Sequence, residues 1–490
     1  LLIFASVSLM LPAKIMITER KMQAGLESAG EELSQFAYLL DSLNEEKQEN
    51  IRNSGEVVLE VDVDSVESIS WENESESLAF HKEDGWIYDD DTAFPVNEEK
   101  INELIEQFEQ FSAAFIIEEV TDYSQYGLDD PVCTIEMVAG EETYNIKLGD
   151  YSSMDSQRYV SIGDGNVYLA TSDPMDYFDA TLSDMILHDD TPSFDNVESI
   201  DFKGSDSYHV VYQEYTEDSP YTYCEDDVYF KEDGENLLPL DTSKVNSYLS
   251  SITYLTLSDY MTYNAGEEDL ATYGLDNPEL TVTVQYTPDA EDDSEVTSET
   301  FTISISRDPE EREKAENASE ETDTEESEEE VTAYARIGDS KIIYQISSSS
   351  YESLMAASYN DLRHPEVLTA SFDDITSMDI SLDGSVYTIT SKGTGDEKTF
   401  YYGEEEIAID DLQSALENMD ASSFTDETPS QKEEISVTVH LDNEVHPQVQ
   451  IQLYRYDGEQ CLAMVDGQSV SLVPRSDVVD LIEAVNALVL

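Results

Sequence analysis

Two short acidic runs are the first candidates for chemistry in this sequence. They are Asp89, Asp90 and Asp91, and Glu225, Asp226 and Asp227. Carboxylate oxygens are the hard ligands that calcium prefers, and the ion takes about six to eight of them in flexible loops. Neither run has the full EF-hand pattern. Because 111 of the 490 residues are Asp or Glu, such runs also arise from composition alone, so calcium binding and a solvated acidic surface both stand as interpretations.

Cysteine and histidine are sparse. The three cysteines, Cys133, Cys224 and Cys461, are too scattered for a CxxC motif, and the six histidines are dispersed. The sequence has no HExxH, GxSxG, Walker A or GxGxxG motif. We therefore expect no catalytic residue, no cofactor and no metal site beyond the calcium candidates, and predict that the protein is not an enzyme. Cys133 is expected to act as a small hydrophobic residue in a core.

The charge balance narrows the classes of partner. Lys and Arg number 23 against 111 Asp and Glu, which gives a formal net charge of -88. Affinity for nucleic acid or for anionic lipid head groups depends on Lys and Arg that neutralise phosphate. The composition therefore excludes nucleic acid and anionic lipid surfaces as partners.

The elements that must position these residues are repeated three times. The stretches "VESISW" at Val66, "VESIDF" at Val197 and "ITSMDI" at Ile375 each predict a short alternating strand, joined through a polar turn to a second strand. A helix with a regular apolar face then comes next in every copy. The residues expected to cap these helices by accepting hydrogen bonds from the first turn are Asn97, Asp241 and Asp410.

A phrase of twelve residues occurs twice, as "YGLDDPVCTIEM" from Tyr126 and "YGLDNPELTVTV" from Tyr273. Glycine permits a positive φ, aspartate can bond to a backbone N–H two residues on, and proline stops any helix. The phrase therefore predicts a structural turn before a half-buried strand. The turn residues are Tyr126, Gly127, Leu128, Asp129 and Pro131 in the first copy, and Tyr273, Gly274, Leu275, Asp276 and Pro278 in the second.

The third copy has lost this turn but has kept the strand. "TPSQKE" from Thr428 replaces the turn, while "EISVTVHL" from Glu434 retains the alternation. A catalytic motif would not be discarded in this way, so the shared residues are expected to build cores and bends.

These patterns predict an α+β fold: three tandem related domains of mainly antiparallel strands with capped helices, preceded by an N-terminal membrane-anchor helix. The domains are expected at residues 53–188, 189–362 and 363–490, the last being a divergent copy. The second contains an acidic run at residues 308–330. Like charges at this density cannot bury apolar area, which predicts a solvated, mobile loop; binding of a cation or a partner is the alternative for this run.

The N-terminus has a different composition from the rest. "LLIFASVSLMLPAKIMI" at residues 1–17 is apolar apart from two serines and one lysine. A helix needs about 20 apolar residues to span a bilayer, and we interpret residues 1–20 as the truncated end of an uncleaved transmembrane signal anchor. The chain would then be a single-pass protein of the cell membrane with its bulk outside the cytoplasm. A buried core helix and a cleaved signal peptide are the alternatives.

Residues 21–52 are predicted to form a helical stalk. Apolar residues between positions 22 and 43 alternate in steps of four and three, the a/d seam of a coiled coil. A homodimer through residues 22–43 is one interpretation. The other is an amphipathic helix that lies on the first domain, and Gly25 and Gly30 favour it because glycine weakens a helix.

The chain resembles the bacterial domain-of-unknown-function 4340 family. The resemblance covers roughly residues 60 to 490, and it rests on the tandem units, the "YGLDxP" turns, "KEDGWIYDDDTAFPV" at residues 82–96 and the apolar N-terminal segment. It implies a membrane-anchored extracytoplasmic protein of the bacterial cell envelope, of a kind often encoded beside an ABC transporter and a gliding-motility-type auxiliary protein. It implies no catalytic residues.

Two functions of different classes are consistent with these observations. The first is a non-catalytic, membrane-anchored accessory or interaction protein that serves an ABC transporter of gliding-motility type or envelope assembly, with an envelope or transporter protein as its partner. The alternative is an extracellular carbohydrate-binding protein or an acid/base hydrolase that uses paired carboxylates about 5 to 10 Å apart. The sequence does not locate such a pair among its 111 acidic residues.

Overall fold

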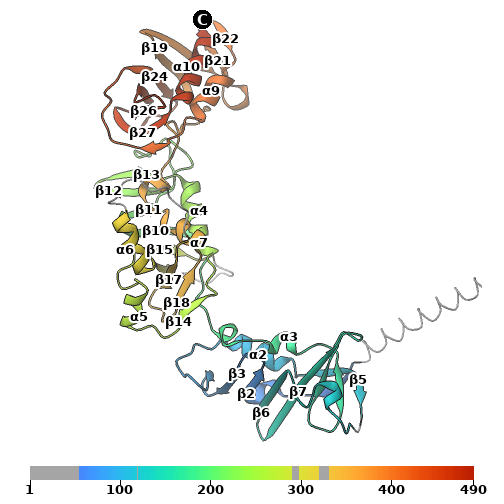
Figure 1. Cartoon of the computed structure of the whole chain (residues 1–490). Helices are drawn as coiled ribbons and strands as arrows, with labels where there is room; N and C mark the ends of the chain where they lie inside the picture. Colours follow the sequence, from blue (N-terminus) through green and yellow to red (C-terminus); the bar gives the residue numbers. More distant parts are fainter. Residues whose placement is uncertain (1–54, 119, 290–296, 319–329, 490) are drawn as a thin grey trace, which may run out of the picture. The chain divides into compact units, whose positions relative to one another are not determined.

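The computed structural model describes residues 55–118, 120–289, 297–318 and 330–489. In these ranges, three nine-stranded antiparallel sheets follow one another along the chain (Figure 1). The chain separates into two compact units, Leu1–Leu187 and His188–Leu490, and the second unit holds two of the sheets. The predicted anchor at 1–20 and the whole predicted stalk at 21–52, including the dimer seam at 22–43, lie outside the described residues. Within the described ranges, every helix is too short or too polar to span a bilayer.

The first unit is built on a sheet with the strand order β1-β5-β9-β8-β7-β6-β2-β3-β4. Its elements are β1 (Glu56–Leu59), β2 (Val66–Asn73), β3 (Ser77–Lys82), β4 (Trp86–Tyr88), α2 (Glu98–Glu106), β5 (Phe111–Ile117), β6 (Cys133–Ala139), β7 (Glu142–Ser152), β8 (Gln157–Ser161), β9 (Val167–Ala170) and α3 (Met175–Phe178).

The second sheet, in the second unit, has the order β13-β12-β11-β10-β15-β16-β17-β18-β14. Its elements are β10 (Asn196–Gly204), β11 (Tyr208–Tyr212), β12 (Tyr229–Asp233), β13 (Asn236–Pro239), α4 (Thr242–Thr253), β14 (Tyr260–Thr262), α5 (Glu267–Thr272), β15 (Leu280–Thr287), β16 (Glu299–Arg307), α6 (Pro309–Ala318), β17 (Ala333–Ile337), β18 (Ile343–Ile346), α7 (Ser348–Met355) and α8 (Tyr359–Leu362).

The third sheet comes next in the same unit, with the order β22-β21-β20-β19-β24-β25-β26-β27-β23. Its elements are β19 (Ile375–Leu382), β20 (Ser385–Lys392), β21 (Thr399–Tyr402), β22 (Glu405–Ile407), α9 (Asp410–Glu417), β23 (Ser423–Phe424), β24 (Glu433–Leu441), β25 (Gln448–Arg455), β26 (Gln460–Val465), β27 (Gln468–Pro474) and α10 (Arg475–Val489). Helices α9 and α10 lie side by side (Figure 1).

The three sheets share one topology. The second and third correspond strand for strand, since β10 takes the place of β19, β15 that of β24 and β14 that of β23. The first sheet has the same order over eight strands, from β5 through β2 to β4, and differs only at its edges, where β1 is added and a strand equivalent to β13 is missing. The prediction of three tandem repeats of mainly antiparallel strands is therefore confirmed.

Each sheet also carries a bulge at the same place, within the "VES" or "ITS" of the repeated phrase. The register slips by one residue between Val66 and Ser68 against β6, and the same slip occurs in β10 and β19. The extra residues are exposed: Glu67, Glu198 and Thr376. A bulge bends the strand and increases its twist, so the short repeated phrase encodes a bend as well as a strand.

The strand after the turn has one buried face in every copy. Cys133, Ile135 and Met137 are fully buried in β6, and Ile435, Val437 and Val439 are at most 1% exposed in β24. Alternation of this kind places one face of an antiparallel sheet against a core and leaves the other half-exposed. The strand that the third copy was predicted to retain is therefore present.

Helix capping agrees with the sequence in two copies and differs in the third. The side chain of Asn97 accepts from the N–H groups of the first turn of α2, and Asp241 does the same for α4. In the third copy the predicted cap, Asp410, is instead the first residue of α9, and Ile409 occupies the N-cap position without a side-chain hydrogen bond. The prediction for Asp410 is wrong because this residue itself belongs to the helix.

The first part of the acidic run at 308–330 forms a helix. Residues 309–318 form helix α6, and Asp308 accepts hydrogen bonds through Oδ1 from the backbone N–H groups of Glu310 and Glu311. The expected loop is corrected over this part, because a carboxylate at a helix N-terminus stabilises the first turn. Residues 319–329 lie outside the described residues.

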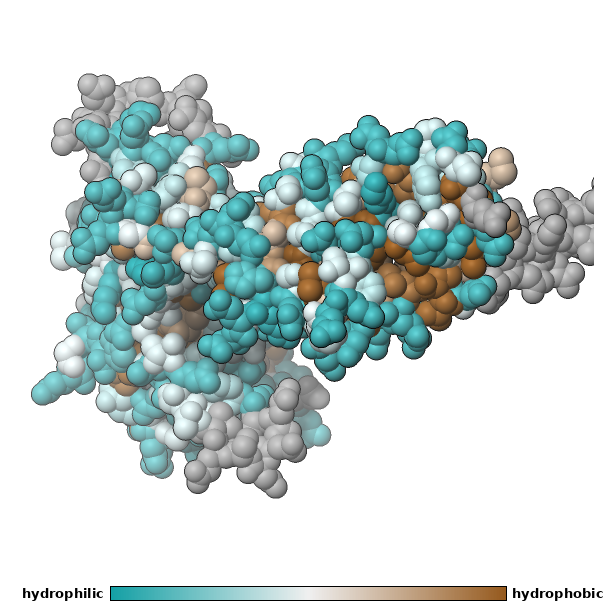
Figure 2. Space-filling view, turned by 90° about the horizontal axis from the view of Figure 1, so that it is seen from below, coloured by the Kyte–Doolittle hydropathy of each residue, from teal (hydrophilic) through white to brown (hydrophobic). Residues whose placement is uncertain are grey.

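Aromatic side chains fill the core of the first unit. Phe80 lies between Trp71 and Tyr88, with ring centroids 5.5 and 5.2 Å away, and Phe178 meets Trp71 edge to face at 5.8 Å. Other apolar side chains of this unit remain at the surface, which Figure 2 shows in brown on its right side. Phe115 on β5 is one of the exposed apolar residues, with 54% of its surface accessible.

Candidate functional site

The repeated turn is a structural element in both copies. Gly127 and Gly274 adopt left-handed backbone conformations, with φ of 70° and 71°. The leucine that follows each glycine, Leu128 or Leu275, is buried. Asp129 and Asp276 are exposed, and among the described residues their side chains accept no hydrogen bond, so the bend depends on glycine and leucine.

The tyrosine of each turn contacts a tyrosine on the equivalent strand. Tyr126 meets Tyr159 on β8 with ring centroids 5.0 Å apart, and Tyr273 meets Tyr334 on β17 at 4.8 Å. Offset and edge-to-face aromatic pairs at such distances add to the energy of burial. The shared phrase therefore fastens the turn to the sheet in the same way in both copies.

The first acidic candidates do not converge on one point. Asp89 contacts His81 Nδ1 at 2.6 Å, Asp90 accepts from the hydroxyl of Tyr88 at 3.3 Å, and Asp91 accepts from the backbone N–H of Ala93. Each carboxylate is thus engaged with a different neighbour. In the described residues, the single group of three ligand atoms within 4.8 Å of one another is found elsewhere.

The second acidic run borders that group. Asp227 is buried, with 1% of its side chain exposed, and its two carboxylate oxygens accept from Thr222 Oγ1 and contact His364 Nε2 at 2.7 Å. His364 in turn places Nδ1 at 3.4 Å from Glu366 Oε2. Neighbouring Glu225 and Asp226 line the same hollow without joining the three-atom group.

Three segments position these side chains. Asp227 precedes β12, Asp241 is the N-cap of α4, and His364 and Glu366 lie in the segment between α8 and β19. The backbone N–H of Asp241 donates to the carbonyl of Leu362 at 3.0 Å, and Lys244 Nζ donates to the carbonyl of Arg363 at 3.0 Å. The start of α4 thus holds the segment that carries the histidine.

The electrostatics of this group favour positive charge. Burial opposes the charged form of His364, but its contacts with the Asp227 and Glu366 carboxylates prevail and raise the pKa of the imidazole to about 9. The contact with His364 also lowers the pKa of Glu366. The positive charge of Lys244 lowers the pKa of Glu366 as well. The group therefore holds a proton on His364 at neutral pH.

A hollow of about 570 Å³ opens beside these residues. Its lining is rich in carboxylates and includes Asp241, His364 and Glu366, together with the buried Asp227. A hollow of this size admits water, ions or a small polar ligand. The three residues of the group therefore line a space that a solute can enter from the surface.

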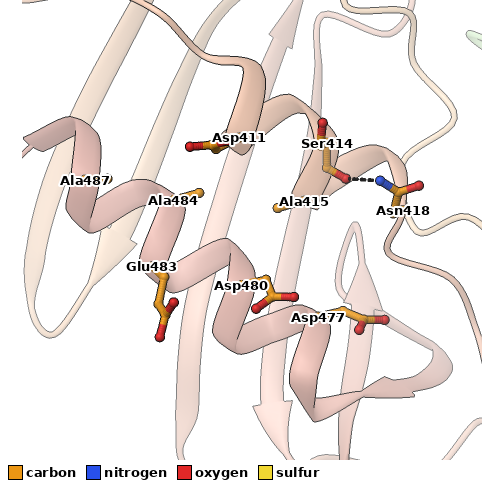
Figure 3. Close-up of a pocket in the computed structure, with 9 residues that line it drawn as sticks. All are labelled: Asp411, Ser414, Ala415, Asn418, Asp477, Asp480, Glu483, Ala484 and Ala487. Carbon is orange, nitrogen blue, oxygen red and sulfur yellow. Dashed lines mark hydrogen bonds between the residues drawn. The ribbon is translucent and has the colours of Figure 1, made fainter.

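A second hollow, of about 530 Å³, lies between α9 and α10. Figure 3 shows its carboxylates, with Asp477 and Asp480 on α10 and Asp411 on α9, beside alanines of both helices. Asn418 donates a hydrogen bond to the carbonyl oxygen of Ser414 at 2.7 Å. The two helices thus present several carboxylates toward one acidic groove.

The three thiols are predicted to be unreactive in the folded protein. Burial raises the pKa of Cys133 and Cys224 to about 12 and that of Cys461 to about 11. Since the thiolate is the nucleophile, these shifts lower its fraction roughly a thousandfold for Cys133 and Cys224 and roughly a hundredfold for Cys461. We expect iodoacetamide at pH 8 to label the native thiols far more slowly than free cysteine, and all three rapidly in urea, as followed by mass spectrometry. Fast labelling of native Cys133 would contradict its place in the core.

The sequence indicates one member of this site as a ligand and misses the other three. Asp227 is among the calcium candidates, whereas Asp241 is predicted only as a helix cap. His364 and Glu366 come from a segment more than 120 positions further along the chain, where the dispersed histidines indicate no site. A sequence signal exists in the short spacing of "HPE", but nothing in it indicates the distant aspartates.

Comparison with known proteins gives one match. A family model described as "Domain of unknown function (DUF4340)" matches residues 86–207 and 233–438, which is more than half of the chain. The matched ranges contain both copies of the repeated turn and most of the first two sheets. No curated protein and no solved structure matches the chain.

Proposed function

The chain belongs to the family described as "Domain of unknown function (DUF4340)", and from this premise we propose that it is a non-catalytic, membrane-anchored accessory protein of the bacterial cell envelope. It would be held by its apolar N-terminal segment, with its sheet domains outside the cytoplasm. Its partner would be an envelope protein or an ABC transporter of gliding-motility type.

The proposal rests on one observation: the residues that the copies share all have structural roles in the fold. The repeated phrases form bulged strands, buried strand faces and a glycine turn fixed by a tyrosine pair. Residues of these kinds preserve a shape. A chain that preserves one shape three times is suited to presenting surfaces to partners, as tandem domains do.

The acidic composition supports the same role. With a net charge of -88, the chain repels anionic head groups, so a polypeptide anchor rather than the surface of the domains would hold it at a membrane. The same charge would select partners with basic faces, because complementary potentials steer association.

Fractionation and co-purification test the proposal. The full chain is expected in the membrane fraction after alkaline extraction, with protease reaching it from outside spheroplasts, and a detergent-solubilised sample is expected to bring transporter subunits with it. A variant that begins at residue 55 is the matched control and is expected to leave the membrane fraction. A full chain found in the cytosol, or one purified alone at every detergent tested, would overturn the proposal.

The acidic groove between α9 and α10 is where we would test the alternative function first. Its several carboxylates line one hollow, and paired carboxylates are the chemistry of glycan hydrolysis. The purified chain should be incubated with envelope glycans beside an Asp480→Asn variant. Cleavage that the variant loses would replace the accessory role with a hydrolase.

A further inference from the structure

The group formed by Asp241, His364 and Glu366 has the composition of a metal site. It places one imidazole nitrogen and two carboxylate oxygens within 4.8 Å of one another. We propose that these three residues bind one divalent transition-metal ion of the zinc type. This inference goes beyond the accessory role and does not rest on it.

Asp227 supplies the outer contact that such a histidine needs. Metal-binding histidines usually donate their second ring N–H to a carboxylate, which fixes the tautomer and orients the ring. Nε2 of His364 lies 2.7 Å from Asp227 Oδ1, and Asp227 is itself buried and held by Thr222. Because the metal-free site holds His364 in its protonated form, the ion would displace the proton from Nδ1. With the remaining proton on Nε2, the Nδ1 lone pair would then face Glu366.

The spacing of the ligand atoms fits an ion better than a hydrogen bond. Nδ1 of His364 and Oε2 of Glu366 are 3.4 Å apart, beyond the usual range for N–H···O bonds. Two ligands that each lie about 2.0 to 2.1 Å from a tetrahedral zinc ion are separated by roughly 3.3 Å. Oε2 of Glu366 is moreover a buried oxygen without a hydrogen-bond partner in the described residues.

Asp241 offers the third ligand from a fixed position. Its Oδ1 accepts from the backbone N–H groups of Ser243 and Lys244 at the start of α4. Its Oδ2 makes no hydrogen bond among the described residues and can turn to the ion. A carboxylate that is already held through one oxygen loses little conformational freedom when the other binds a metal.

The donor set selects the class of ion. Imidazole nitrogen with carboxylate oxygen suits zinc and its neighbours, whereas calcium requires about six to eight oxygen ligands. Three protein ligands leave a fourth position, which faces the hollow of about 570 Å³, so water or a small anionic ligand can reach the ion. The calcium candidates Glu225 and Asp226 line the hollow but are not ligands in this assignment.

A bound ion would link two parts of the second unit. Asp241 belongs to the helix of the second sheet, while His364 and Glu366 lie in the segment that leads to the third. Beyond them, the backbone N–H of Val367 donates to the carbonyl of Met419, and that of Ala421 donates to the carbonyl of Pro365. The ion would therefore fasten α4 to a segment already tied to the third sheet.

Metal titration of the full chain in detergent tests the proposal. Zinc is added in competition with a chromophoric chelator, with millimolar magnesium and calcium present to occupy the general acidic surface. One zinc per chain is expected, and cobalt in the same position should give the strong visible absorption of a four-coordinate site. His364→Gln should remove this binding, and Asp227→Asn should weaken it about 10- to 100-fold.

His440→Gln is the matched control. His440 also pairs with an aspartate, through Nε2 at 3.0 Å from Asp379 Oδ2, but it belongs to no group of three ligand atoms in the described part of the chain. Zinc binding in this variant should equal that of the parent chain. Glu366→Gln, which changes a partly exposed side chain, serves if His364→Gln fails to fold, and it should weaken binding at least about tenfold. Absence of zinc binding under magnesium, or equal loss in the His440 and His364 variants, would overturn the proposal.

Discussion

Replacing Phe80 with alanine is expected to lower the free energy of unfolding of the first unit by about 3 to 5 kcal/mol. The side chain is fully buried and stacks between Trp71 and Tyr88. Alanine removes the transfer energy of the ring and leaves a cavity that neighbours on a paired sheet cannot close. Both tryptophans of the chain, Trp71 and Trp86, lie in this unit, so their fluorescence during urea unfolding follows it selectively.

Phe115→Ala provides the matched control on the same sheet. Phe115 is 54% exposed on β5, and an exposed substitution usually changes the free energy of unfolding by no more than about 0.5 kcal/mol. The two variants delete the same atoms, so the difference between their changes in the free energy of unfolding measures the effect of burial. Losses of equal size would show that the aromatic cluster around Phe80 is not the core of the unit.

Gly127→Ala is expected to destabilise the first unit by about 2 to 4 kcal/mol. A Cβ at this position would lie 2.5 Å from Asp150 Oδ1 and 2.7 Å from the backbone nitrogen of Asp150, while φ is +70°. The left-handed conformation costs a residue with a Cβ roughly 1 to 2 kcal/mol, and the overlap with backbone adds to it. Urea unfolding followed by tryptophan fluorescence measures the loss.

Gly140→Ala separates the cost of the left-handed conformation from the cost of the overlap with Asp150. Gly140 also has a positive φ, +58°, but a Cβ there would meet no atom within 4 Å. Only the conformational cost remains, so a loss of about 1 kcal/mol is expected. If both variants lose the same amount, the close approach of the turn to Asp150 contributes nothing and the turn is looser than its geometry indicates.

The repeat could be predicted from the sequence because its signals are local. Period-two alternation, a capping residue and a glycine before aspartate and proline each act within a few positions, and they place β6, β15 and β24 as well as α2 and α4 correctly. The bulge was not predicted, although "VES" and "ITS" mark it in all three copies. A bulge is defined by two residues of one strand that lie opposite one residue of its partner, so it can be recognised only when the partner strand is known.

The third copy shows where local signals fail. "IAID" predicts a cap at Asp410, yet the helix takes in this residue and begins at the position where a cap is expected. In the acidic run, charge density predicts a loop, while the carboxylate of Asp308 caps the first turn of a helix. These local hydrogen bonds stabilise a helix in a segment whose composition predicts a loop.

The candidate site could not be assembled from the sequence, for a physical reason. Its residues are brought together by the packing of α4 against the segment after α8. Backbone hydrogen bonds, such as that from the N–H of Asp241 to the carbonyl of Leu362, hold this packing. Nothing in the residues around Asp227 specifies that His364 will lie 2.7 Å away. Long-range contacts of this kind arise from tertiary packing, which a repeat pattern predicts in outline and not in its side chains.

The order of strands in the second sheet has a consequence for how the chain is made. Asn196, in β10, pairs with Thr287, in β15, 91 positions later. On a ribosome, β10 therefore emerges long before its central partner exists, and closing so long a loop is slow. During that interval the edge of β10 that will face β15 stays unpaired, and we expect the chain's net charge of -88 to repel neighbouring chains from it until the sheet closes.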